Sequence, residues 1–309
     1  MRRLIFAATL ALGLAPGAHA QQPLTKVTLG YTPVIDYLGA FVAKEQGLFE
    51  KHGLDVTVQQ MPNGNSIPPG LLSESLQIGG ITSPTLIQSR AASFPMRIVA
   101  GASIVTKANP NGSIVVRKGV DIKSPKDFEG KRVAVAAVGS YFNVLFRQWL
   151  IDNGVDPNKV VFVEAPFGQM ADVMRNGQVD AATVGQPFLG RIVAADIGSD
   201  FAAYTGTFGD GLLSNIYVAT DQWIAKNPAA PKAFGEAIEE ANAFIKAQPD
   251  GARKAAAKYL KLPAEAMANL PFSNYSSKVT PQQIDAWSKI MVGQKLTDQP
   301  IDPNSVLAQ

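Results

Sequence analysis

The order of the expected strands and helices is what most restricts the fold of this chain. In the first hundred residues, four segments alternate between apolar and polar residues as strands do, and three segments with helical periodicity separate them. The strands are expected at 26–30, 54–60, 77–81 and 96–100, and the helices at 38–48 and 83–92, with the end of a further short helix at 71–76. Strands that alternate with helices are joined by right-handed crossovers, which predicts a mostly parallel sheet flanked by helices.

The same pattern restarts after a loop at 109–112 that is rich in Asn, Pro and Gly. Four further strands are expected at 113–117, 133–138, 159–163 and 179–184, with helices at 140–153 and 169–176. A last strand at 215–219 is followed only by helical patterns, at 231–248, 252–260 and 281–293. The chain therefore predicts two α/β modules of similar size and a helical tail that packs back on the first of them.

A tail that returns to the first module makes that domain discontinuous. We expect lobe I to comprise residues 21–110 and 216–309, and lobe II to comprise residues 111–215. The chain then crosses between the lobes twice, and the two crossings form a hinge. Two hinged lobes with a cleft between them are suited to closing around a ligand.

The N-terminal residues indicate export. A basic start, Met1 to Arg3, leads into an apolar run, Leu4 to Leu14, and then into Ala18-His19-Ala20, the small-x-small pattern that a signal peptidase cleaves. The apolar run is too short to span a bilayer. We therefore expect a signal peptide at 1–20, cleaved near Ala20/Gln21. Because there is no cysteine to carry a lipid, the mature chain is expected to be a free monomer in the periplasm, not a lipoprotein.

The composition argues against most enzyme classes and against nucleic acid. The chain has no cysteine, and of its two histidines only His52 remains after cleavage, where it is expected to be a solvated turn residue. A G-x-S-x-G serine elbow, a P-loop and a G-x-G-x-x-G dinucleotide motif are all absent. Loss of Arg2 and Arg3 leaves 28 − 2 = 26 scattered basic residues against 25 acidic ones. We expect no catalytic turnover, no metal ion, no cofactor and no nucleic-acid partner.

Ligands of such sheets bind beyond the carboxyl ends of the strands, where helices begin. In the second module the strand at 133–138 runs into Gly139, Ser140 and Tyr141. Gly139 allows the backbone to approach a solute closely, and the N–H groups of Ser140 and Tyr141 and the Ser140 hydroxyl are placed to hold an anionic oxygen. The Tyr141 side chain is expected either to stack on a flat solute or to donate its hydroxyl. A plain helix cap is the alternative interpretation of Gly-Ser here.

The other candidates follow strands in both modules. Tyr31, Thr32 and Pro33 come directly after the first strand, and Asp36 is expected to accept a hydrogen bond from a ligand or to cap the next helix. The remaining ligand-binding candidates are hydroxyl, amide and aromatic side chains near other strand ends, namely Ser83, Thr85, Gln186, Phe188 and Asn215. Ser83 and Thr85 also suit helix capping.

None of the arginines of the second module is strongly indicated as a ligand-binding residue. Arg147 lies about two helical turns past Ser140 and is expected to point away, and Arg175 and Arg191 are expected at the solvated surface. Helix starts, hydroxyls and amides without a fixed arginine suit a monoanion or a neutral polar solute better than a dianion.

Four segments also carry a family resemblance. They are GYTP with the following FVAKEQGLFEKHGLDV, then SLQIGGITSPTLIQS, SPKDFEGKRVAVAAVGS and RNGQVDAATVGQPF, which together span most of residues 27–220. In order and spacing they resemble the solute-binding proteins of bacterial ABC importers, in the nitrate/sulfonate/taurine and thiamine-precursor group. The resemblance implies a type II periplasmic-binding-protein clamshell with two crossover strands, and binding without turnover. It implies a membrane permease with a cytosolic ATPase as partner. Gln186 departs from the acidic residue that many relatives carry before Pro-Phe.

The leading functional hypothesis is therefore a periplasmic receptor that captures a small polar organic solute by lobe closure and delivers it to an ABC importer. A sulfonate or carboxylate is the favoured class of solute. The alternatives are a clamshell enzyme of the thiamine-pyrimidine type, a binding protein for a neutral heterocycle such as a pyrimidine precursor, and a sensor lobe that signals to a membrane kinase.

Overall fold

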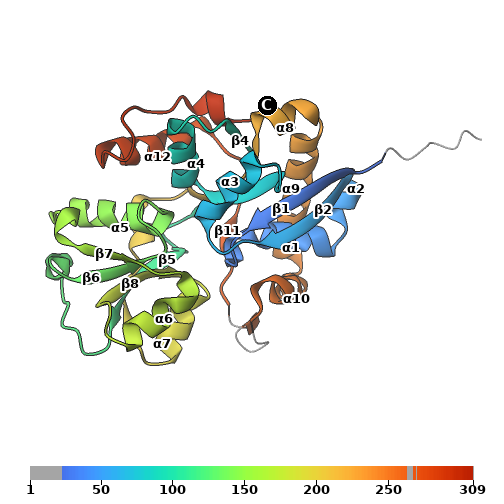
Figure 1. Cartoon of the computed structure of the whole chain (residues 1–309). Coiled ribbons are helices and arrows are strands. Elements are labelled where there is room, and N and C mark those ends of the chain that lie inside the picture. The colour runs from blue at the N-terminus through green and yellow to red at the C-terminus, as the bar shows by residue number, and fades with distance from the viewer. Residues whose placement is uncertain (1–22, 263–266, 269, 309) are drawn as a thin grey trace, which may run out of the picture.

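The computed structural model describes residues 23–262, 267–268 and 270–308. The expected signal peptide, residues 1–20, lies outside the described residues. The described chain forms two units, each built around one β-sheet with helices on its faces (Figure 1). Within these residues, no helix combines the length and the apolar character needed to cross a membrane.

The first sheet has six strands in the order β11-β4-β10-β3-β1-β2. They are β1 (Thr25–Tyr31), β2 (Leu54–Gln60), β3 (Ile78–Thr82), β4 (Met96–Val105), β10 (Leu212–Thr220) and β11 (Asn274–Tyr275). β1 pairs in parallel with β2 and β3, but β10 runs antiparallel between β3 and β4, and β11 runs antiparallel to β4. Four of the six strands, β1 to β4, run in one direction, as expected, and the sheet is mixed because the strand that returns from the second unit inserts antiparallel between two strands of the first.

The second sheet has five strands in the order β7-β6-β8-β5-β9. They are β5 (Gly112–Arg117), β6 (Arg132–Val135), β7 (Val161–Glu164), β8 (Ala181–Gly185) and β9 (Gly198–Ala202). β6 pairs in parallel with β7 and β8, whereas β5, the strand that enters this unit, runs antiparallel to β8 and β9. This sheet is mixed for the same reason as the first: a crossover strand enters it against the direction of its neighbours.

The helices cover the faces of the two sheets (Figure 1). Those before and within the second unit are α1 (Leu38–Glu45), α2 (Leu48–Lys51), α3 (Ile67–Leu72), α4 (Ser83–Ala91), α5 (Tyr141–Asp152), α6 (Phe167–Arg175) and α7 (Phe188–Ala194). The tail contains α8 (Asp221–Lys226), α9 (Ala230–Ala247), α10 (Pro249–Leu260) and α12 (Pro281–Gly293). The helical tail is confirmed, and it packs on the first unit, where α9 contacts α1, α2 and β4. Phe49 of α2 stacks on Phe234 of α9 with ring centroids 5.2 Å apart.

The chain passes between the units twice, once between β4 and β5 and once between β9 and β10. β10 pairs within the first sheet from Leu212 onward, so the boundary expected at 215/216 falls inside a strand of that sheet. The division into lobes I and II stays a prediction. We call the first sheet with its helices unit 1, and the second sheet with its helices unit 2.

A third connection joins the units away from the crossover strands. α12 lies beside α4 and over the start of α5 (Figure 1). The Gln88 side chain of α4 donates to the Gly139 carbonyl at 3.0 Å, and Gln294, just after α12, donates to the Val144 carbonyl of α5 at 2.9 Å. The Trp287 ring of α12 packs on the Tyr141 ring of α5, with centroids 5.5 Å apart. Unit 1 therefore fixes the position at which α5 begins.

Candidate functional site

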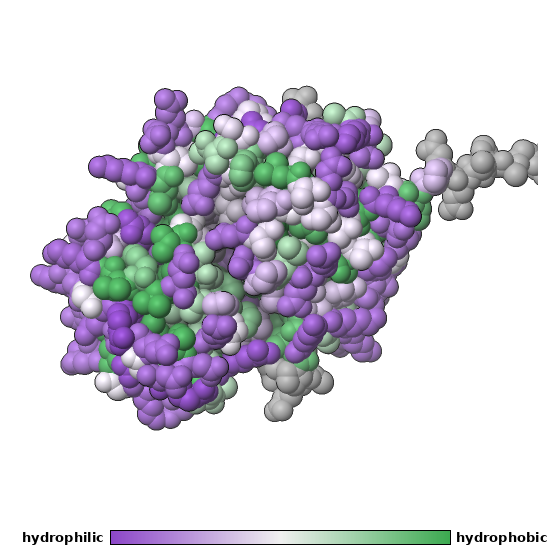
Figure 2. Space-filling view, in the orientation of Figure 1, coloured by the Kyte–Doolittle hydropathy of each residue, from purple (hydrophilic) through white to green (hydrophobic). Residues whose placement is uncertain are grey.

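A cavity of about 460 Å³ lies between the two units. From unit 1 it is lined by the loop that follows β1, by the end of β3 and by the first turn of α4; from unit 2 it is lined by the starts of α5, α6 and α7. In the space-filling view the junction of the units is a shaded hollow of pale and green residues with purple, hydrophilic ones around it (Figure 2). The cavity is therefore built where strands end and helices begin, as the sequence pattern predicts.

Nine of the twelve candidate residues line this cavity. They come from both units and are Thr32, Pro33, Asp36, Thr85, Ser140, Tyr141, Gln186, Phe188 and Asn215. The other three, Tyr31, Ser83 and Gly139, lie next to lining residues in the chain but do not line the cavity. That the nine bind a solute stays a prediction.

Two of the residues outside the lining serve the interior of unit 1. Tyr31 is 4% exposed and packs edge-on against Phe41, with ring centroids 4.9 Å apart. The Ser83 hydroxyl is buried and donates to the Leu213 carbonyl at 2.9 Å. Ser83 is also not the N-cap of α4, because Thr82 occupies that position. Both side chains point into packed surroundings and so are not available to a solute.

Gly139 shapes the turn that leads into α5. Its φ of +76° lies in the left-handed region, its N–H donates to the Asn143 side chain at 2.8 Å, and its carbonyl accepts from Gln88. A Cβ at this position would lie 2.7 Å from the Gln88 amide nitrogen. The close approach expected of this glycine is therefore to the neighbouring unit and not to a solute.

The start of α5 offers hydrogen-bond donors to the cavity. Ser140 holds the N-cap position in an extended conformation, and its hydroxyl makes no capping bond. That hydroxyl oxygen is buried and has no partner among the described residues. The Ser140 N–H, which we expected to face a ligand, instead donates to the Ala137 carbonyl at 3.2 Å. The N–H groups of Tyr141 and Phe142 have no acceptor within the described chain, as expected for the first turn of a helix.

The Tyr141 side chain is fixed on two sides. It is 3% exposed, its ring packs on Trp287, and its hydroxyl donates to the Asn111 side-chain oxygen at 3.0 Å. Burial raises the pKa of this phenol well above its usual value. The hydroxyl therefore stays protonated and is already engaged, so its role at the cavity is to hold Asn111 of the crossover segment.

Asp36 is a buried carboxyl at the wall of the cavity. It is 8% exposed and accepts hydrogen bonds from the Ser103 hydroxyl at 2.8 Å and the Ser273 hydroxyl at 3.2 Å. Burial raises its pKa, although these hydroxyl bonds oppose the shift. It caps no helix, because Val34 holds the N-cap of its short 3₁₀ turn. The helix-cap interpretation is therefore wrong, and Asp36 instead ties together the first turn after β1, β4 and the tail.

We predict that Asp36→Asn makes the protein more stable at neutral pH. The folded state binds a proton at Asp36 more tightly than the unfolded chain, whose aspartate pKa is about 3.9. The stability that this tighter proton binding adds is fully present below that pH and is lost as the pH rises through the raised pKa of the folded state. Urea denaturation of both proteins between pH 4 and 8 should show the variant lacking part of that fall. Asp298→Asn, at an exposed carboxyl, is the control, and a variant less stable than the native protein at pH 7 would contradict the prediction.

The other polar candidates form short networks at the cavity. The Tyr37 hydroxyl donates to the Asn215 side-chain oxygen at 3.0 Å. The hydroxyls of Thr82 and Thr85 lie 2.9 Å apart, and the Gln186 side-chain oxygen accepts from the Gly190 N–H at 3.3 Å. Each of these side chains keeps further donor or acceptor capacity for a bound molecule.

Sequence reasoning missed several lining residues. The most informative are Asn111, Phe142, Phe167 and Lys261, together with Arg191, which we expected at the solvated surface and which is exposed but lines the cavity. The Arg191 guanidinium lies over the Phe188 ring at 5.8 Å from its centroid. Phe142 lies next to Tyr141 and Arg191 lies three residues after Phe188, so nearness to a candidate at a helix start is the signal that would have found these two. Phe167 is the first residue of α6, a helix start at which the sequence analysis named no candidate.

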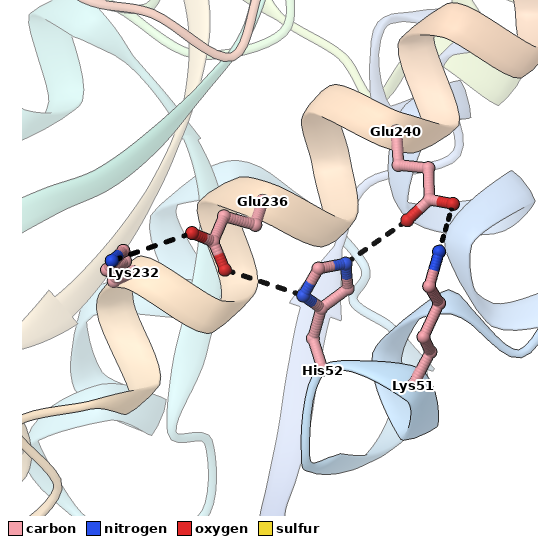
Figure 3. Close-up of polar contacts among 5 residues, drawn as sticks. All are labelled: Lys51, His52, Lys232, Glu236 and Glu240. Carbon is pink, nitrogen blue, oxygen red and sulfur yellow. Dashed lines mark hydrogen bonds and ion pairs between the residues drawn. The ribbon is translucent and has the colours of Figure 1, made fainter.

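His52 is not among the residues that line the cavity. It ends α2, and its ring nitrogens lie 3.5 Å from a carboxylate oxygen of Glu236 and 3.2 Å from one of Glu240, both on α9 (Figure 3). Its side chain is 21% exposed, so it is a docking contact between two helices and not the solvated turn residue we expected. Within the described residues, no cluster of His, Asp and Glu has the arrangement of a metal site.

Comparison with known proteins places this architecture in a family. Residues 20–261 match the model of the NMT1-like family. A putative binding protein of Brucella abortus is 29% identical over 265 residues, which cover 84% of this chain and 79% of that protein. The nitrate/nitrite binding protein NrtA of Synechococcus elongatus is 29% identical over 239 residues, 70% of this chain and 54% of NrtA.

Solved structures share the fold. The alkanesulfonate-binding protein SsuA from Xanthomonas axonopodis pv. citri, bound to MOPS, superimposes with a TM-score of 0.77 at 16% identity, over 92% of this chain and 98% of that chain. The desulfurization enzyme DSZB superimposes with a TM-score of 0.69 at 13% identity, over 92% of this chain and 96% of that chain, so the fold alone does not separate binding from catalysis. The family resemblance and the clamshell fold read from the sequence are confirmed. With a family model that spans most of its length, the chain belongs to the NMT1-like family and has the periplasmic-binding-protein fold.

Proposed function

We propose that the protein is a periplasmic receptor that captures a small organic acid, a sulfonate or a carboxylate, and delivers it to an ABC importer. The observation that carries this proposal is the cavity between the units, at which the first turns of α4, α5 and α6 converge. Unpaired N–H groups and the positive end of the helix dipole favour an anion at such a place. The buried, unpartnered Ser140 hydroxyl adds a donor beside them.

The charges around the cavity also favour an acid. Arg191 and Lys261 line it at exposed positions, whereas Asp36 is the one acidic residue of the lining within the described part of the chain. Asp36 is engaged by two hydroxyls, and burial favours its neutral form, which lessens its repulsion of an anion. NrtA, whose name gives nitrate and nitrite as its ligands, lends support to an anion as the solute, and SsuA, whose title gives an alkanesulfonate, lends support to an organic acid.

Binding without turnover suits the side chains that are present. The described cavity lining contains no histidine, and the chain has no cysteine. A receptor role also accounts for the two crossover segments, which would allow the units to close on a solute. Delivery then requires a membrane permease with a cytosolic ATPase as partner, and a free monomer in the periplasm as carrier.

Ser140→Ala is expected to weaken binding of the acid by roughly 10- to 100-fold, because a hydrogen bond to a charged group contributes about 1.5–3 kcal/mol. Calorimetry with a panel of sulfonates and carboxylates measures this, and chromatography of the solute afterwards should return it unchanged. Ser73→Ala is the matched control, because the Ser73 hydroxyl is at an exposed position at the end of α3 and bonds only to Gly70 and Ser75 close by in the chain. Equal affinities of Ser140→Ala and the native protein would remove the start of α5 from the site, and a converted solute would overturn the receptor role.

A further inference from the structure

Three phenylalanine rings form a continuous aromatic wall on the unit 2 side of the cavity. Phe142, Phe167 and Phe188 all line the cavity, and each is only partly buried. The rings of Phe167 and Phe188 are stacked, with centroids 5.4 Å apart and planes at 20°. The ring of Phe142 meets Phe167 edge-on, at 5.9 Å and 78°. These are the separations and angles at which aromatic rings attract one another.

The backbone of unit 2 is adapted to hold this wall. Gly112 of β5 and Gly185 of β8 are opposite each other in the sheet register. A Cβ at Gly112 would lie 2.1 Å from a ring carbon of Phe142, and one at Gly185 would lie 2.8 Å from another. The Phe142 ring therefore rests on two paired glycines, and no side chain larger than hydrogen fits beneath it. Phe167 and Phe188 are each the first residue of a helix, α6 and α7.

An inorganic oxyanion, which is a central atom surrounded by oxygens, has no apolar part that could pack against these three rings. Partly exposed rings on three adjoining elements leave apolar surface facing the cavity, and a solute must cover that surface to remove it from water. A cavity of about 460 Å³ falls in the range of sites for organic ligands, so an organic body has room beside the helix starts. Arg191, with its guanidinium over Phe188, places a positive charge at the edge of the same wall.

We propose that the solute is an aromatic organic acid, whose ring packs on the wall of Phe142, Phe167 and Phe188 while its acid group faces the start of α5. This inference deepens the proposed function and rests on it. Ring contacts in offset-stacked or edge-on geometry add attraction beyond the area they cover, and a saturated ring of the same size lacks that part. Phe167 and Phe188 are then the residues that determine specificity for aromatic over aliphatic acids.

The test uses pairs of acids that share a head group and differ only in the ring. Benzenesulfonate is compared with cyclohexanesulfonate, and benzoate with cyclohexanecarboxylate, by calorimetry on the purified protein. The aromatic member of each pair is expected to bind at least about threefold to tenfold more tightly. Phe167→Leu and Phe188→Leu should bring that ratio close to one while changing the affinity for the cyclohexyl acids much less. Phe162→Leu, at a ring of the same unit that does not line the cavity, should leave the ratio unchanged.

The outcomes separate this inference from the function beneath it. Equal binding of the aromatic and saturated acids, or binding of alkyl acids only, overturns the aromatic inference and leaves an organic-acid receptor. A ratio that survives both leucine variants also overturns it, because the preference then arises elsewhere. If the folded protein binds none of the sulfonates and carboxylates, the proposed function itself fails.

Discussion

Trp287→Ala is expected to lower the free energy of unfolding by about 3–5 kcal/mol, the range typical of a large buried ring replaced by alanine. Trp287 is fully buried in the core that both units share, with residues of β10, α4 and α5 in the same cluster. Its indole N–H donates to the Leu213 carbonyl at 2.5 Å, and its ring packs on Tyr141 at the start of α5. Urea denaturation of the native protein and the variant measures the difference.

Trp287→Phe is the control that separates ring volume from the hydrogen bond. It keeps an aromatic ring against Tyr141, and the Leu213 carbonyl remains satisfied because Ser83 also donates to it. We expect this variant to lose much less stability than Trp287→Ala, on the order of 1 kcal/mol for one hydrogen bond. An alanine variant that is no less stable than the phenylalanine variant would show that the α12 contact does not hold the two units together.

The regular elements of the fold are largely legible in the sequence. The strand at 54–60 and the helix at 281–293 have the bounds that the pattern predicts. In each case the apolar residues repeat with the period of the element, and residues that end a strand or helix stand on both sides. In the helix, Thr280 and Gln283 form a capping box. The return of the tail to unit 1 also follows, because an amphipathic helix as long as α9 needs an apolar face to cover.

Two strands, and the direction in which strands pair, could not be predicted from the sequence. β9 contains Gly198, Ser199 and Asp200 and lacks apolar alternation, and β11 has only two residues, so neither gives a periodic signal. Both are edge strands, held by a neighbour and not by their own pattern. The insertion of β10 between β3 and β4 is a property of the returning chain. A local pattern predicts a strand but not its neighbours, which is why the antiparallel placement of β10 and β5 within the two sheets was not expected.

The site shows the same division between local and tertiary information. Strand ends and helix starts are local features, and they placed nine of the candidates at the cavity. The direction of a side chain at such a junction is decided by packing: Tyr31 turns to Phe41, and Thr32 next to it lines the cavity. Lys261 could not be predicted as a lining residue, because it belongs to the tail and comes to the cavity only through the return of the chain.

Gly112→Ala is expected to weaken binding of an acid in the cavity by roughly 5- to 150-fold. The new Cβ would lie 2.1 Å from one ring carbon of Phe142 and 2.7 Å from another, so the ring must move away from β5. Forcing an extra methyl group into packed surroundings typically costs about 1–3 kcal/mol, and a bound solute would have to push the ring back against that strain. Calorimetry with the tightest-binding acid measures the change.

A second substitution and a control glycine test whether Gly112→Ala acts through its contact with the Phe142 ring. Phe142→Leu shortens the side chain, so adding Gly112→Ala to it should cost much less affinity than Gly112→Ala costs alone, and the double-mutant cycle measures this coupling. Gly293, the last residue of α12, is not among the residues that line the cavity, and a Cβ there meets nothing within 4 Å. Gly293→Ala should therefore bind nearly as the native protein does. If Gly112→Ala also binds like the native protein, or if the two effects are simply additive, the glycines beneath Phe142 do not shape the site.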